Sequence, residues 1–153
     1  MTSIGIYGSL GRMGQAIAAA APEMNAKLAG GADAGDDPAG IAAVADVLID
    51  FSAPQALEAH LAAARAAGKP IVIGTTGLSP QHHALIDEAA QRIAVLQTGN
   101  TSLGIGLLQR LVREAAAQLG PDWDIEIVEM HHRHKADAPS GTALMLGNAA
   151  AAG

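Results

Sequence analysis

The chain has 153 residues, of which half are hydrophobic and 2% aromatic, and its formal net charge is −6. This length suits one core built from Ala, Val, Leu and Ile, and the absence of cysteine excludes disulfides, thiolate zinc sites and a cysteine nucleophile. An acidic chain without a Lys/Arg cluster or an apolar run of roughly 20 residues is not expected to bind nucleic acid or a membrane.

The chain enters a strand pattern at once, without the basic and apolar regions of a signal peptide, so we expect a cytoplasmic protein. Short apolar runs predict six strands, at residues 3–7, 26–33, 46–51, 70–75, 92–98 and 124–132. Between them, Ala-rich stretches predict helices at residues 13–21, 53–68, 79–92 and 104–120, with a last helix from 143. The connection between the second and third strands is short, which predicts a turn and a shortened crossover.

Alternation of strands and helices predicts an α/β fold, a doubly wound, mostly parallel sheet of the Rossmann type. The helix at 104–120 places Leu107, Leu108, Leu111, Val112 and Ala115 on one face. We predict that this α/β domain extends over residues 1–128.

A glycine turn follows the first strand, with Gly8, Gly11 and Gly14 spaced G-x-x-G-x-x-G. The spacing alone is a weak signal, because plain strand-to-helix turns also contain glycine. A turn that follows a strand and opens a helix lets the backbone approach a pyrophosphate and directs free amides at it. The context therefore favours a dinucleotide cofactor.

Asp33 ends the second predicted strand, about where a carboxylate holds the ribose hydroxyls of such a cofactor. A carboxylate favours NADH, whereas a 2′-phosphate requires a cation, for which Arg12 in the glycine turn is the nearest candidate. NADH is therefore favoured and NADPH stays possible. Three more loops, at residues 50–54, 74–77 and 98–102, end strands at the same sheet edge and are predicted to surround the nicotinamide riboside.

The stretch from Glu129 to Ala143 contains three histidines, a lysine and a Pro-Ser-Gly-Thr turn. A metal site is disfavoured, because His131 and His132 are neighbours that point to opposite faces of a strand, and no cysteine completes a ligand set. Two interpretations of this segment remain, a solvated polar loop and an anion-binding catalytic loop. For the latter, the residues Ser140, Gly141 and Thr142 begin a helix whose free amides suit a carboxylate.

The run "EMHHRHKADAPSGTA" closely resembles the signature of the dihydrodipicolinate (4-hydroxy-tetrahydrodipicolinate) reductase family. "GSLGRMG", "VLIDFSAP", "VIGTTG" and "TGNTSLG" resemble its other motifs in the same order, so the resemblance covers essentially the whole chain. It implies NAD(P)H-dependent reduction of 4-hydroxy-tetrahydrodipicolinate, a cyclic dicarboxylate, to tetrahydrodipicolinate in lysine (diaminopimelate) biosynthesis. It further implies that residues 1–128 form a dinucleotide-binding domain, and that residues 129–153 are the start of a second, substrate-binding α+β domain. A homotetramer is implied for a complete family member.

The resemblance also implies residue roles. His131 would be the general acid/base and Lys135 the proton donor, with the substrate bound by His132, Ser140, Gly141 and Thr142. The cofactor would be bound by Gly8, Ser9, Leu10, Gly11, Arg12, Met13, Asp33, Gly74, Thr75, Thr76, Thr98, Gly99, Asn100 and Thr101.

The chain departs from the family pattern in three ways. Ala34 stands where an arginine often follows the acidic residue, and Thr101 stands where an aromatic residue is frequent. Family members also continue past the signature with a mixed sheet that covers the substrate. The alternative function is therefore an isolated NAD(P)H-binding module with little turnover. Aspartate and homoserine dehydrogenases are weaker alternatives, because their signatures differ.

Overall fold

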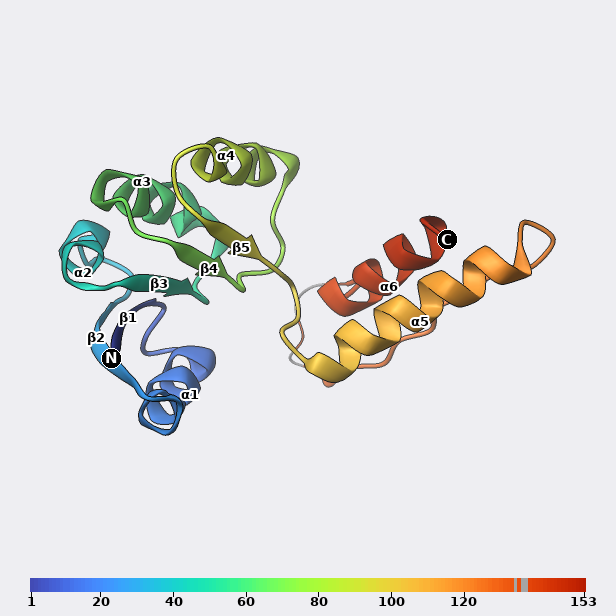
Figure 1. Cartoon of the computed structure of the whole chain (residues 1–153), viewed down its shortest axis with the longest axis horizontal. Helices are drawn as coiled ribbons and strands as arrows, with labels where there is room; N and C mark the ends of the chain where they lie inside the picture. Colours follow the sequence, from blue (N-terminus) through green and yellow to red (C-terminus); the bar gives the residue numbers. More distant parts are fainter. Residues whose placement is uncertain (134, 136–137) are drawn as a thin grey trace. The chain divides into compact units, whose positions relative to one another are not determined.

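The computed structural model describes residues 1–133, 135 and 138–153. The described chain divides into two compact units, residues 1–98 and 99–153. The predicted boundary after residue 128 lies within the second unit and stays a prediction about domains. Figure 1 shows the elements of both units, which are described separately below.

The first unit is a five-stranded parallel sheet with helices on both faces, which confirms the predicted doubly wound α/β fold. The strand order is β2-β1-β3-β4-β5. The strands are β1 (Thr2–Tyr7), β2 (Ala26–Ala32), β3 (Val47–Asp50), β4 (Ile71–Ile73) and β5 (Val95–Gln97). The chain moves outward from β1 to β2 and then returns past β1 to β3, so the order reverses between β1 and β3. Ligands of doubly wound sheets bind at such a reversal, beyond the carboxyl ends of the strands.

The connecting helices of this unit follow each strand in turn. They are α1 (Arg12–Ala20), η1 (Ala21–Met24), α2 (Pro38–Val44), η2 (Pro54–Ala56), α3 (Leu57–Ala67) and α4 (Pro80–Ala90). In Figure 1, α2, α3 and α4 lie together on one face of the sheet and α1 lies on the other. The short crossover between β2 and β3 contains a seven-residue helix, α2, which Asp37 caps by accepting a hydrogen bond from the amide of Ala39. Ser79 caps α4 as its sequence predicts, and the ring of His82 completes a capping box.

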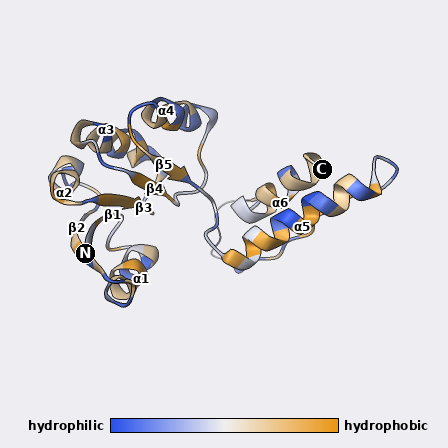
Figure 2. Cartoon of the chain, in the orientation of Figure 1, coloured by the Kyte–Doolittle hydropathy of each residue, from blue (hydrophilic) through white to orange (hydrophobic). Residues whose placement is uncertain are grey.

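The core of the first unit lies between the sheet and helices α2 to α4. Tyr7, Leu48, Ile71 and Ile73 come from the strands and Leu57 from α3, and each is at most 1% exposed. Figure 2 shows the hydrophobic strands at the centre of this unit. Burial of aliphatic side chains on both faces explains the continuous apolar runs in the sequence, which a parallel sheet requires.

In the second unit, α5 (Leu103–Leu119) packs along α6 (Gly141–Ala151). A sixth strand over residues 124–132 is a wrong prediction: these residues form no strand. A strand needs a neighbour to complete its hydrogen-bond ladder, and the five-stranded sheet contains none of these residues. Among the described residues, no helix is long and apolar enough to cross a membrane.

Candidate functional site

The glycine turn after β1 is built by close backbone contacts. Gly8 has a φ of +79°, and a Cβ there would lie 2.5 Å from the carbonyl oxygen of Phe51. A Cβ on Gly14 would overlap the backbone of Gly8 and Ser9. These contacts require glycine and bring the start of α1 close to the turn. Gly11 is the N-cap of α1, and the first turn of that helix contains no acidic residue, so its positive end is available to an anion.

Asp33 follows β2 and is tied to the glycine turn. Its carboxylate accepts a hydrogen bond from the Ser9 hydroxyl at 2.5 Å and from the amide of Leu10 at 3.1 Å. The backbone amide of Asp33 donates to the carboxylate of Asp36 at 2.9 Å. A carboxylate has about four acceptor sites, so these two donors leave capacity for ribose hydroxyls.

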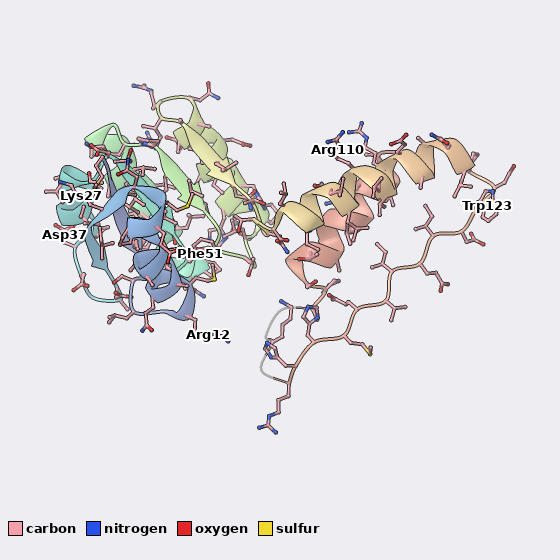
Figure 3. The ribbon with its side chains drawn as sticks, turned by 60° about the horizontal axis from the view of Figure 1, so that its bottom comes forward. Arg12, Lys27, Asp37, Phe51, Arg110 and Trp123 are labelled. Carbon is pink, nitrogen blue, oxygen red and sulfur yellow. The ribbon has the colours of Figure 1, made fainter. Side chains whose placement is uncertain are left out.

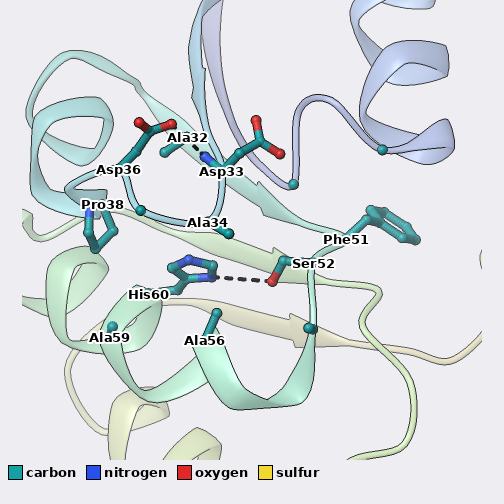
Figure 4. Close-up of a pocket in the computed structure, with 14 residues that line it drawn as sticks. Ala32, Asp33, Ala34, Asp36, Pro38, Phe51, Ser52, Ala56, Ala59 and His60 are labelled. Atoms are coloured by element: carbon teal, nitrogen blue, oxygen red, sulfur yellow. Dashed lines mark hydrogen bonds between the residues drawn. The ribbon is translucent and has the colours of Figure 1, made fainter.

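A pocket of about 420 Å³ lies beyond the carboxyl ends of β1, β2 and β3, where the strand order reverses. Its size falls within the range of small-molecule sites. Glycine, alanine and proline dominate its lining, and Figure 4 shows the turn at Ala34 and Pro38 facing Ala56 and Ala59 across it. The lining residues are Gly8, Gly11, Ala32, Asp33, Ala34, Gly35, Asp36, Pro38, Phe51, Ser52, Ala53, Ala56, Ala59 and His60.

The electrostatic character of this pocket is acidic. Its charged lining residues are Asp33 and Asp36, and its lining contains neither lysine nor arginine. Arg12, the cation proposed from sequence for a 2′-phosphate, is not among the lining residues and extends outward from the start of α1 in Figure 3.

A buried polar network lies beside the pocket, and sequence reasoning did not find it. Asp50, at the end of β3, is fully buried, and its Oδ2 lies 2.7 Å from Nδ1 of His60. Its Oδ1 accepts from the amide and hydroxyl of Ser52, at 3.0 and 2.6 Å, and from the Thr75 hydroxyl at 2.9 Å. Burial opposes ionisation, but the hydrogen bonds from His60 and from the hydroxyls of Ser52 and Thr75 outweigh it and lower the pKa of Asp50.

Tyr7 joins the same network from β1. Its ring stacks on His60 with a centroid distance of 4.0 Å, and its hydroxyl donates to the carbonyl of Pro38 at 3.0 Å. Burial, with the nearby charge of Asp50, raises the pKa of Tyr7 to about 12. In the sequence, the one indication of this network is that His60 lies on the apolar face of α3, beside Leu57 and Leu61.

The predicted loop Gly74–Thr76 lies next to this network. A Cβ on Gly74 would overlap the Phe51 ring, and Thr75 turns its hydroxyl inward to Asp50. The structure therefore brings Gly8–Met13, Asp33 and Gly74–Thr76 to the carboxyl edge of one sheet. Their role in binding a cofactor stays a prediction.

The second unit contains the start of α6 and the histidine-rich segment. Ser140 is the N-cap of α6 and accepts a hydrogen bond from the amide of Ala143 at 3.1 Å. Within the described part of the chain, the amides of Gly141 and Thr142 have no hydrogen-bond acceptor. Asn100 donates to the Thr142 hydroxyl at 2.8 Å, so the predicted cofactor loop 98–101 contacts the predicted carboxylate site inside this unit.

Glu129 connects the histidine segment to α6. Its Oε1 accepts from the amide of Ser140 at 2.7 Å, and its Oε2 lies 3.4 Å from Nδ1 of His131. Hydrogen bonding by Ser140 and the charge of His131 lower the pKa of Glu129. His134 lies outside the described residues, and the described residues contain no group of three or more metal-ligating side chains.

Together, the parallel sheet, the strand reversal and the glycine turn define a Rossmann-type α/β protein. Residues 2–101 match the family model for the N-terminus of dihydrodipicolinate reductase, and residues 104–153 match the model for its C-terminus. The chain therefore belongs to the dihydrodipicolinate reductase family, as the sequence motifs predicted.

Relatives and a solved structure agree with this assignment. The chain is 55% identical over 157 residues to the 4-hydroxy-tetrahydrodipicolinate reductase of Zymomonas mobilis, covering 98% of this chain and 62% of that protein. It is 52% identical to the Dinoroseobacter shibae reductase, covering 77% and 44%. A dipicolinate-bound dihydrodipicolinate reductase from Paenisporosarcina sp. TG-14 has a TM-score of 0.72 at 24% identity, covering 99% of this chain and 66% of that chain, and shares its fold. The chain thus spans less than two thirds of the length of the Zymomonas mobilis and Dinoroseobacter shibae reductases.

Proposed function

We propose that this chain acts in the NAD(P)H-dependent reduction of 4-hydroxy-tetrahydrodipicolinate to tetrahydrodipicolinate, a step of lysine (diaminopimelate) biosynthesis. The observation that carries the proposal is the pocket at the strand reversal, with a glycine turn and Asp33 at one end, in a chain of this reductase family. The close contacts at Gly8 and Gly14 suit a backbone that receives a pyrophosphate. When bound, the dinucleotide supplies the hydride.

Gly8–Met13 would hold the pyrophosphate, Asp33 the adenosine ribose, and the loops Gly74–Thr76 and Thr98–Thr101 the nicotinamide half. We favour NADH over NADPH, because the pocket is lined by Asp33 and Asp36 without a cation, and a 2′-phosphate would be repelled there. Asp33→Ala should weaken NADH binding about tenfold or more, the loss expected for hydrogen bonds to a charged group, and NADPH binding less. Calorimetric titration measures both; equal losses would contradict the role of Asp33.

The second unit would hold and protonate the substrate. The amides of Gly141 and Thr142, at the positive end of α6, suit one carboxylate of a cyclic dicarboxylate. Ser140 and His132 would complete the substrate contacts, with His131 as general acid/base and Lys135 as proton donor. Glu129 supports this arrangement, because it contacts both Ser140 and His131.

We further propose the domain division after residue 128, a cytoplasmic location and a homotetramer for the whole protein. The first two rest on the sequence patterns, and the third on the family. A mass measurement of the purified protein in solution tests the assembly.

Addition of 4-hydroxy-tetrahydrodipicolinate to the purified chain tests the activity, with the oxidation of NADH followed by the loss of its absorbance. We expect oxidation only when this substrate is present. Binding of NADH without turnover would support the alternative, an isolated dinucleotide-binding module. A folded sample that neither binds nor oxidises NADH would contradict both.

A further inference from the structure

We propose that His60 is a specificity-determining residue that reads the nucleobase: its Nε2 accepts a hydrogen bond from the exocyclic amine of adenine. This inference rests on the proposed function, because it requires the pocket to hold the adenosine half of a dinucleotide. His60 lies on α3, outside both the glycine turn and the histidine-rich segment.

The lining of the pocket places a base beside His60. The lining includes Gly8 and Gly11 of the glycine turn, which suits phosphates, and Asp33, the proposed ribose partner. Beyond Asp33, the turn at Ala34 and the residue Ala59 of α3 form walls of small apolar groups, which suit a flat ring. Figure 4 shows His60 between these two walls.

The Asp50 contact determines which nitrogen of His60 carries a proton. Asp50 is fully buried and accepts three hydrogen bonds on Oδ1, which favours its ionised, acceptor-only form. Because Nδ1 of His60 lies 2.7 Å from Oδ2, this nitrogen must donate. In the neutral imidazole, Nε2 is then an acceptor.

The remaining contacts hold the ring in place and leave Nε2 available. Tyr7 stacks on the ring at an interplanar angle of 9°, and His60 is 9% exposed. The hydrogen-bond contacts of His60 with Ser52 and Asp50 both involve Nδ1, and Nε2 has no partner within the described ranges. An oriented acceptor in an apolar slot should discriminate strongly between a base that offers a donor and one that does not.

Adenine and hypoxanthine supply that contrast. The 6-amino group of adenine donates, whereas the 6-oxo group of hypoxanthine accepts and would oppose Nε2. We expect NADH to bind at least about tenfold more tightly than reduced nicotinamide hypoxanthine dinucleotide, the ratio that one hydrogen bond of ordinary strength supplies.

The experiment titrates the full 153-residue chain with both dinucleotides and follows nucleotide fluorescence. His60→Phe keeps a flat ring against Tyr7 but removes both nitrogens, and should bind the two dinucleotides equally. His83→Phe, on the exposed surface of α4, is the matched control and should keep the wild-type preference.

Equal binding of the two dinucleotides by the wild-type chain, or a preference that survives in His60→Phe, would overturn the inference and leave the proposed dinucleotide binding intact. Absence of binding to either dinucleotide would overturn both. If His60→Phe does not fold, the imidazole ¹⁵N chemical shifts of the wild-type chain test the inference instead. We expect His60 to carry its proton on Nδ1. A proton on Nε2 alone would contradict the proposed hydrogen bond from adenine.

Discussion

The two units of this chain differ in how they bury their apolar side chains. In the first unit, Leu48 and Ile73 are completely buried between the sheet and its helices. In the second, Leu107 and Leu111 on α5 are 56% and 54% exposed, although the same helical periodicity predicted their shared face. Figure 2 shows this hydrophobic colouring along α5. An amphipathic pattern thus predicts which side chains share a face, but burial requires a surface that covers that face.

The units also differ in chemistry. The first unit contains the pocket and the buried, hydrogen-bonded carboxylate of Asp50, whereas the second contains His131, Lys135 and the start of α6. We therefore expect substitutions to separate binding, stability and turnover according to the unit in which they lie.

The largest effect should follow from removal of the proposed proton-transfer groups. His131→Gln and Lys135→Ala should each lower turnover by about 10²–10⁴, the contribution typical of a positioned acid or base. Binding of NADH should persist, because the pocket lies in the first unit. Steady-state rates and a parallel NADH titration measure the two. A loss of NADH affinity comparable with the loss of rate would contradict the assignment of cofactor binding to the first unit and proton transfer to the second.

A matched pair of leucines tests the difference in packing. Leu48→Ala should lower the free energy of unfolding by about 2–5 kcal/mol, because it leaves a cavity in a closed core. Leu111→Ala should cost less than about 1 kcal/mol, because its side chain is 54% exposed. Urea unfolding of both variants provides the comparison, and equal losses would show that α5 is covered in solution.

The buried carboxylate should make the stability of the first unit sensitive to acid. Asp50 has a folded-state pKa below its unfolded value, so its contribution is present above the unfolded value, about 3.9, and is lost as pH falls through the folded value. Asp50→Asn should lower the free energy of unfolding at neutral pH by about 1–3 kcal/mol, since its hydrogen-bond donors lose a charged acceptor.

The pH dependence of that variant is the second measurement. Thermal unfolding between about pH 5 and 2 should show a shallower decline for Asp50→Asn than for the wild type. An identical decline would mean that other carboxylates determine the acid response.

The smallest effect should come from the helix caps. Ser79→Ala and Ser140→Ala each remove a side-chain acceptor from a helix N-terminus, worth about 1 kcal/mol. The loss at α4 should appear in cooperative unfolding of the first unit, whereas the loss at α6 should appear as faster local amide exchange. If Ser140→Ala instead destabilised the whole first unit, the caps of α4 and α6 would not act on separate units.

The sequence by itself determined much of this protein. Five of the six predicted strands, the predicted helices and the glycine turn are present in the structure, because hydrophobic period and backbone conformation act over a few residues. The motif order also predicted the family. The position of Asp33 beside the glycine turn followed from the strand-to-helix topology.

Tertiary structure decided the rest. The segment 124–132 has an alternating pattern but forms no strand, because hydrogen bonding to a neighbouring strand is a property of the fold. The network of Asp50, His60 and Tyr7 joins β3, α3 and β1, so no spacing along the chain indicated it. His60 had the pattern of a core residue, and only its contact with a buried carboxylate at the pocket distinguished it.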